Sequence, residues 1–115
     1  MVYRRKKYIV DDSIVEDFNL HFNRTLLPTQ LKYGSRLVGR WMTKVNDGKV
    51  EIFAIWEYDS YTAYEEIEMK VRSDVAHVER VQKWYEKMGG REGLKNYFFS
   101  INENFLESTV STNVE

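Results

Sequence analysis

The chain contains no cysteine among its 115 residues. This absence excludes disulfide bonds, thiolate metal sites and a cysteine nucleophile, and it is compatible with a reducing compartment. The chain has only two histidines, His21 and His77, and they lie far apart in the sequence. Because a metal site needs several ligands at suitable spacing, we expect no bound metal.

Long apolar segments and a surplus of charge of one sign are also absent. No apolar run approaches the length of a membrane span, and the N-terminal basic cluster is not followed by the apolar core of a signal peptide. The formal net charge is −1, so the electrostatic footprint of a general nucleic-acid binder is missing. We therefore expect a soluble, cytoplasmic protein with no membrane span and no nucleic-acid partner.

Several motifs that identify enzymes are missing as well. The sequence has no glycine-rich phosphate loop, no GxSxG elbow and no Ser/His/Asp set with supporting context. Gly89-Gly90 indicates the end of a helix. The sequence alone therefore does not decide whether the protein is an enzyme.

The composition that is present indicates one packed domain. Hydrophobic residues make up 43% of the chain and aromatic residues 15%, which is typical of a globular protein of this length. We expect the domain to cover residues 1–106. Residues 107–115 are small and polar, and we expect them to form a flexible C-terminal tail.

Four segments are rich in β-branched and aromatic residues, which is typical of strands. They are residues 2–10, 36–45, 49–58 and 94–105. Asn46-Asp47-Gly48 predicts a tight hairpin between the second and third, because these residues tolerate positive φ. The third strand has apolar residues at both sets of alternating positions, which predicts a central strand covered on both sides.

Two regions between these strands have apolar residues at helical spacing, and Ser73-Asp74 is expected to divide the second region into two helices. The expected apolar faces are Val15, Phe18, Phe22 and Leu26, then Tyr61, Tyr64, Ile67 and Val71, then Val75, Val78, Val81, Tyr85 and Met88. Pro28 is expected to end or kink the first helix, and Gly34 to precede the next strand.

The order β-α-β-β-α-β predicts an α+β, ferredoxin-like fold with a four-stranded antiparallel sheet and helices on one face. Such a sheet leaves its other face open, although aromatic residues occupy both faces here. A second copy of the chain would cover the open face. We therefore expect a homodimer in which two sheets face each other as a dimeric α/β barrel with a cavity.

Three segments also resemble one known family. FNLHFNRTLLPTQLKYGSRLVGRW (Phe18 to Trp41), EIFAIWEYDSYTAYEEIE (Glu51 to Glu68) and KVRSDVAHVERV (Lys70 to Val81) together resemble the NIPSNAP family. The resemblance implies a dimeric α/β barrel of ferredoxin-like subunits, and it implies no settled activity. The wider dimeric α/β-barrel superfamily includes cofactor-free monooxygenases and haem-degrading enzymes, but function resides in the site and not in the fold.

The haem-degrading branch of that superfamily implies an asparagine on the first strand, a tryptophan on the third and a histidine on a later helix. The chain is similar at Trp56 and His77, but its first strand contains no asparagine. We therefore predict no cofactor; the missing asparagine argues against haem without excluding it.

His77 is the candidate catalytic residue, because a neutral imidazole can act as a proton shuttle or an axial ligand near neutral pH. The structural alternative is a boundary histidine that packs on Trp84 and bonds to Asp74. His21 is expected to be a surface or boundary residue.

The run Arg4 to Lys7 is unusual for a strand, because charged residues are seldom buried without partners. Cross-strand ion pairs with Glu51 and Glu57 would account for it. Alternatively, Arg5 and Arg40 point into the cavity and bind a carboxylate or phosphate.

Trp41 and Trp56 are the remaining candidate ligand-binding residues, since either could stack on a flat organic molecule; the alternative is core or interface packing. The leading hypothesis is a homodimer whose barrel cavity binds a small, partly apolar or anionic molecule. The alternatives are a cofactor-independent monooxygenase with His77 as base, and a structural or interaction module without a ligand.

Overall fold

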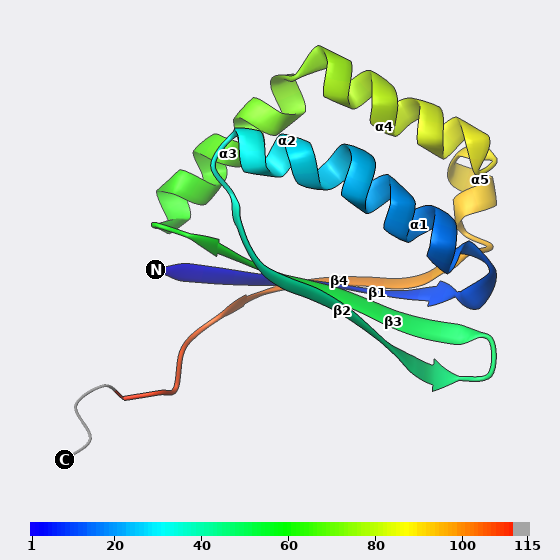
Figure 1. Ribbon diagram of the computed structural model, residues 1–115, viewed down its shortest axis with the longest axis horizontal. Coiled ribbons are helices and arrows are strands. Elements are labelled where there is room, and N and C mark those ends of the chain that lie inside the picture. The colour runs from blue at the N-terminus through cyan, green and yellow to red at the C-terminus, as the bar shows by residue number, and fades with distance from the viewer. Residues whose placement is uncertain (112–115) are drawn as a thin grey trace.

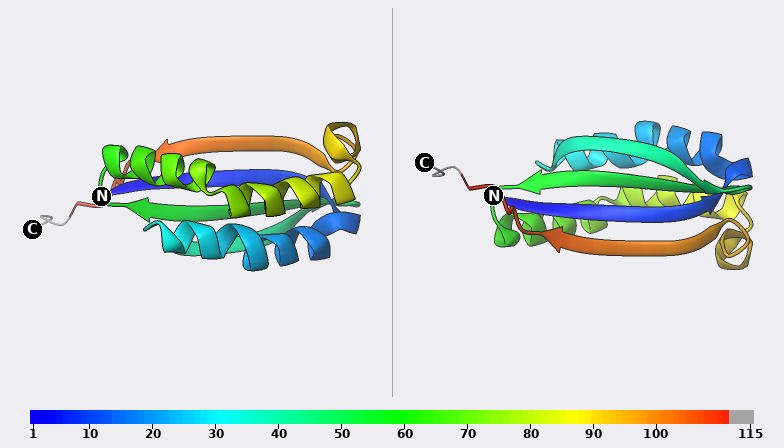
Figure 2. Two further views of the ribbon diagram at one scale, coloured as in Figure 1. Left: turned by 90° about the horizontal axis from the view of Figure 1, so that it is seen from above. Right: turned by 90° about the horizontal axis from the view of Figure 1, so that it is seen from below.

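The computed structural model describes residues 1–111, which form one four-stranded antiparallel sheet in the order β2-β3-β1-β4. The strands are β1 (Val2–Asp11), β2 (Arg36–Asn46), β3 (Lys49–Tyr58) and β4 (Phe98–Leu106). All the helices lie on one face of this sheet, and the other face carries none (Figures 1 and 2). The predicted α+β, ferredoxin-like fold is confirmed.

Two helical stretches of the chain cover that face. The first consists of a 3₁₀ turn η1 (Asp12–Ile14), α1 (Val15–His21), a π-helical segment η2 (Phe22–Leu26) and α2 (Leu27–Lys32). The second consists of α3 (Tyr61–Ser73), α4 (Val75–Lys87) and the short α5 (Gly90–Leu94).

The central pair of strands follows the sequence pattern closely. β3 runs over the predicted residues, and it alternates between buried and half-buried positions. Gly48 has a φ of 84°, which the predicted hairpin turn requires and which glycine adopts at little cost. The buried set of β3 faces the helices and forms the floor of the core. That set is Val50, Ile52, Ala54, Trp56 and Tyr58.

The first helical region continues past the expected break. Pro28 has no N–H to donate to a carbonyl in the preceding turn, and the wider π-helical turn of η2 directly precedes it. Because the wider π turn leaves room for the proline ring and for the carbonyl that Pro28 cannot bond, the chain stays helical to Lys32 as α2. Phe18 and Phe22 are buried as predicted.

Both helices of the second region begin at a side-chain cap, and Ser73-Asp74 divides them as predicted. The side chain of Ser60 accepts a hydrogen bond from the Ala63 amide at 3.0 Å, and Asp74 accepts one from the His77 amide at 3.1 Å. Each cap satisfies an amide that has no partner inside its helix.

The expected buried face of α4 was right at Val81 and Met88 and wrong at Val75 and Val78. Val75 and Val78 are 70% and 44% exposed, whereas His77 is buried and Trp84 packs against the core. The positions that face inward are His77, Val81, Trp84 and Met88, which recur at helical spacing. Burying the large Trp84 indole gains more apolar contact than burying a valine, and this sets the rotation of the helix.

The start of the last strand was also wrong. Residues 94–97 were expected in a strand, but Gly90–Leu94 form α5 and β4 begins only at Phe98. The left-handed backbone at Gly89, with a φ of 93°, ends α4 and redirects the chain into α5. Of the expected tail, residues 107–111 have neither helix nor strand, and residues 112–115 lie outside the described residues.

The basic run of β1 is divided between the two faces of the sheet. Lys7 pairs with Glu51 at 3.7 Å, as expected. Arg4 instead points toward the helices, where it is only 4% exposed. It donates to Glu103 at 3.0 Å and to the Tyr58 hydroxyl at 3.2 Å.

Burial lowers the pKa of Arg4, but Tyr58 and Glu103 outweigh it, so the pKa is raised overall. Glu68 adds a carboxylate 3.9 Å from the Arg4 guanidinium. The network explains how a cation is accommodated beneath a helix layer.

We expect Arg4→Met to destabilise the fold by about 2 kcal/mol, because it leaves the half-buried Glu68 and the buried Tyr58 hydroxyl without their cationic partner. Arg72→Met, at an exposed position of α3, is the matched control and should change stability little. Urea unfolding at pH 7 measures both. A loss at Arg4 no larger than that at Arg72 would contradict a stabilising role for the network.

Candidate functional site

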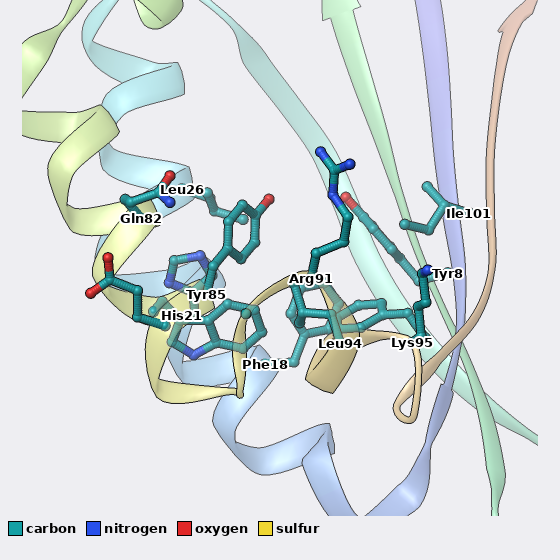
Figure 3. Close-up of a pocket in the computed structure, with 14 residues that line it drawn as sticks. Tyr8, Phe18, His21, Leu26, Gln82, Tyr85, Arg91, Leu94, Lys95 and Ile101 are labelled. Carbon is teal, nitrogen blue, oxygen red and sulfur yellow. The ribbon is translucent and has the colours of Figure 1, made fainter.

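A cavity of about 580 Å³ lies between the sheet and the helices α1, α4 and α5. Figure 3 shows side chains from β1, β4 and these helices pointing into it. Its volume falls within the range of small-molecule sites. The cavity is on the helix-covered face of the sheet.

Aromatic side chains form most of one wall. Phe18 contacts Tyr8 edge-on at 5.0 Å and Phe98 at 5.1 Å between ring centroids. Trp84 closes the wall from α4, with its ring 6.0 Å from that of Phe18. These rings hold one another at fixed angles, so the wall is a rigid apolar surface of the kind on which a flat molecule can pack.

Polar groups are few and come mainly from α5 and the tyrosines. In Figure 3 the guanidinium of Arg91 and the hydroxyls of Tyr8 and Tyr85 extend into the same space. Lys95 lines the cavity too, and its ammonium lies 3.3 Å from Glu92. Glu86 is the one carboxylate among the lining residues of the described chain. An apolar wall with a few convergent polar groups is typical of a ligand site.

Arg40 lies beside this cavity, on the helix side of β2. Its guanidinium is 4.3 Å from the Phe22 ring centroid and 5.2 Å from that of Phe18, and Nη1 donates to Asn19 at 2.6 Å. Its Nη2 is buried and has no hydrogen-bond partner within residues 1–111. Burial lowers the pKa of Arg40 to about 10, and the nearby Tyr8 phenol partly opposes that effect.

His21 at the end of α1 and His77 on α4 are neighbours where these two helices pack together. The His21 ring stacks on Trp84 at 4.3 Å, with the ring planes inclined by only 6°. Burial lowers the pKa of His21 to about 4, and the charge of the neighbouring His77 lowers it further. Burial also lowers the pKa of His77, with Arg80 adding to the effect and Asp74 opposing it. Both imidazoles are therefore neutral at pH 7.

The structure places the predicted catalytic residue behind the cavity. His77 is not among the residues that line it, and its Nδ1 has no hydrogen-bond partner in the described chain. The Asp74 side chain bonds the His77 backbone, and the ring that stacks on Trp84 belongs to His21. His21, expected at the surface or boundary, is 7% exposed and lines the cavity.

The four predicted ligand-binding residues are divided between the two faces of the sheet. Arg40 and Trp56 lie on the helix side, where Trp56 is buried against Phe22. Arg5 and Trp41 lie on the open face, opposite Ile55 and Phe53 of β3. No single cavity within one chain therefore brings all four together.

The open face has its own aromatic cluster. The Trp41 ring lies 5.5 Å from that of Phe53 and covers the Cα of Gly39, where an added Cβ would fall 2.3 Å from the indole. Gly39 thus lets the indole lie flat along the strand. Trp41 is nevertheless 49% exposed.

Sequence reasoning missed the cavity residues Trp84, Arg91 and Lys95. The residues His77, Val81, Trp84 and Met88 recur at helical spacing and could have identified the inward face of α4. Nothing in the sequence indicated that Arg91 points inward, since that depends on the turn into α5. Among residues 1–111, no cluster of metal-ligating side chains is present. The helices of this part of the chain are all too short or too polar to cross a membrane.

The buried His21 predicts a loss of stability in mild acid. Its pKa is about 6.5 in the unfolded chain and about 4 in the folded one, so only the unfolded state takes up a proton as the pH falls from 6.5 to 4. We expect the free energy of unfolding to fall by about 2 kcal/mol between pH 7.5 and pH 5. His21→Phe keeps a ring against Trp84 and should flatten this slope, leaving the smaller contribution of His77.

Urea unfolding at a fixed protein concentration across this pH range measures the slope. The carboxylates with lowered pKa, such as Asp74 and Glu57, lose their contribution only at lower pH and do not interfere. An identical slope in the variant would show that His21 is not the group that titrates.

The fold of the chain occurs in bacterial proteins of known structure. It superimposes on a NIPSNAP family protein from Agrobacterium tumefaciens with a TM-score of 0.69 at 15% identity, covering 99% of this chain and 98% of that one. An uncharacterized NIPSNAP domain protein from Burkholderia xenovorans gives a TM-score of 0.64 at 17% identity, with 100% and 99% covered. Because the sequence identities are this low, the superpositions show a shared fold and do not show a shared function.

A second structure from Agrobacterium tumefaciens, a NIPSNAP family protein with unknown function, gives a TM-score of 0.67 at 15% identity and covers 92% of this chain and 86% of that one. No curated protein matches the chain. The sequence pattern of the NIPSNAP family matches residues 3–90, which is most of the described domain. The chain therefore belongs to the NIPSNAP family.

Proposed function

We propose that the protein is a homodimeric binder of a small, partly apolar molecule, and that the ligand occupies the cavity between the sheet and α1, α4 and α5. The cavity itself carries this proposal, because a rigid aromatic wall with a few polar groups remains open in a domain of this size. The site expected from sequence was a barrel cavity at the sheet; the proposal now places it on the helix side.

The open face of the sheet supports the dimer. Trp41, Phe53 and Ile55 project from it, yet no helix of the described chain covers that face (Figure 2). Arg5 lies on the same face, and its Nε is buried without a hydrogen-bond partner in residues 1–111. A second sheet laid against this face would bury the aromatic cluster and supply partners for such a group, closing the α/β barrel.

The alternative of a cofactor-independent monooxygenase needs a base at the wall of the cavity. His21 is better placed for that role than His77, because it lines the cavity and is neutral at pH 7. A neutral, stacked imidazole serves equally well as part of an apolar binding wall. Binding is therefore the function that the geometry supports best.

The dimer is tested by placing a charge on the open face. The wild-type protein should sediment as a dimer at micromolar concentration, and Trp41→Glu should shift it to monomer because a buried, unpaired carboxylate opposes the interface. Val78→Glu puts the same charge on the exposed side of α4 and should leave the dimer intact. A wild-type monomer would contradict the proposal.

The cavity is tested with a neutral aromatic probe. We expect 2-naphthamide to bind in the submillimolar range by isothermal titration calorimetry. Ile101→Trp fills the cavity from β4 and should weaken this binding about tenfold or more. Val78→Trp adds the same side chain at the exposed face of α4 and should have no effect. Equal affinity in wild type and Ile101→Trp would place the probe outside the cavity.

A further inference from the structure

The helix side of the sheet carries more positive charge than its own carboxylates neutralise. Arg4 has Glu68 and Glu103 as partners. In contrast, no ion pair joins Lys6, Arg40 or Arg91 to a carboxylate within the described chain. A buried cationic group is costly unless it is paired, and Nη2 of Arg40 is such a group. The half-buried Lys6 and the exposed Arg91 add positive potential around it, so the region points to a missing anion.

These cations gather around one phenol, that of Tyr8. Lys6 and Arg40 both pair in register with Ala54, on either side of it, so a single small side chain separates them across the helix-covered face. The Lys6 ammonium lies 5.8 Å from the Tyr8 ring centroid. Arg91 approaches the same cavity from α5, as Figure 3 shows. The Tyr8 hydroxyl is thus a hydrogen-bond donor in a region of positive potential.

The ring of Tyr8 belongs to the aromatic wall, and the rest of that wall is apolar. Phe18, Trp84 and Phe98 form the aromatic wall, and His21 next to them is neutral. Lys95 is paired with Glu92, and Glu86 adds one negative charge to the lining from α4. The cavity is therefore asymmetric: one end is suited to a flat apolar body and the other to an anionic group.

We propose that the ligand of this cavity is an aromatic carboxylate, with its rings against Phe18 and Trp84 and its carboxylate held by Arg91 and the Tyr8 hydroxyl. This inference rests on the proposed function and adds the ligand class to it. A planar guanidinium matches a carboxylate with two parallel hydrogen bonds, and the positive potential from Lys6 and Arg40 strengthens them. Ligand binding thus neutralises the charge that the fold leaves unpaired.

The experiment compares two probes of the same shape, 2-naphthoate and its neutral amide 2-naphthamide, by isothermal titration calorimetry of the full chain. The wild-type protein should bind the carboxylate about tenfold more tightly or better. Arg91→Gln should abolish this preference, so that the two probes bind within about twofold of each other. Arg80→Gln removes an exposed cation of α4 outside the cavity and should retain the preference.

Arg40→Met provides a second test at a residue that does not itself line the cavity. It should reduce the preference for the carboxylate by severalfold, because it removes the positive potential behind Tyr8 without removing a direct contact. Equal binding of the two probes by the wild-type protein, or an unchanged preference in Arg91→Gln, overturns the inference and leaves the binding function standing. Failure of both probes to bind overturns the two proposals together.

Discussion

The inward direction of the cations on β1 is the constraint on which the rest of the structure depends. The alternation of the strand sends Arg4 and Lys6 to the side on which the helices pack, in register with Trp56 and Ala54 of β3. A buried cation must have a partner, and Arg4 obtains Glu68 from α3 and Glu103 from β4. This network joins the α3 end of the helix layer closely to the sheet.

The other end of the helix layer is held differently. There the contacts are aromatic, from Phe18 on α1 to Trp84 on α4 and Phe98 on β4, and the cavity opens beside them. Arg40 and Arg91 form no ion pair with a described carboxylate, and Lys6 shares Glu103 with Arg4, so this end combines an apolar wall with positive charge. The same chain thus makes a closed polar core under α3 and an open amphipathic site under α4.

Much of the fold could be predicted from sequence because its signals are local. The hairpin at Asn46-Asp47-Gly48 and the caps at Ser60 and Asp74 depend on residues within a few positions of one another. The rotation of α4 and the short α5 could not be predicted in this way. They depend on which side chain the core accepts, and the Trp84 indole displaces the valines that the simple apolar pattern favoured.

The candidate site was predictable only in part. Arg40 was predicted to bind an anion in the cavity, and it lies beside the cavity on the helix side. The sequence could not show that Arg5 and Trp41 lie on the opposite face. Alternation along one strand sorts its residues into two sets, one for each face of the sheet. Only the register between strands decides which sets of neighbouring strands lie on the same face. Arg91 and His21 enter the site through the tertiary packing of α5 and α1, which leaves no local pattern.

The central claim is that the helix-side cavity, and not the sheet face, holds an anionic aromatic ligand. A crystal structure of the protein with 2-naphthoate tests it most directly. The account predicts naphthalene density against Phe18 and Trp84, with the carboxylate at hydrogen-bond distance from Arg91 and the Tyr8 hydroxyl. Density for the probe on the open face beside Trp41, or in the cavity with its carboxylate turned away from Arg91, would contradict the account.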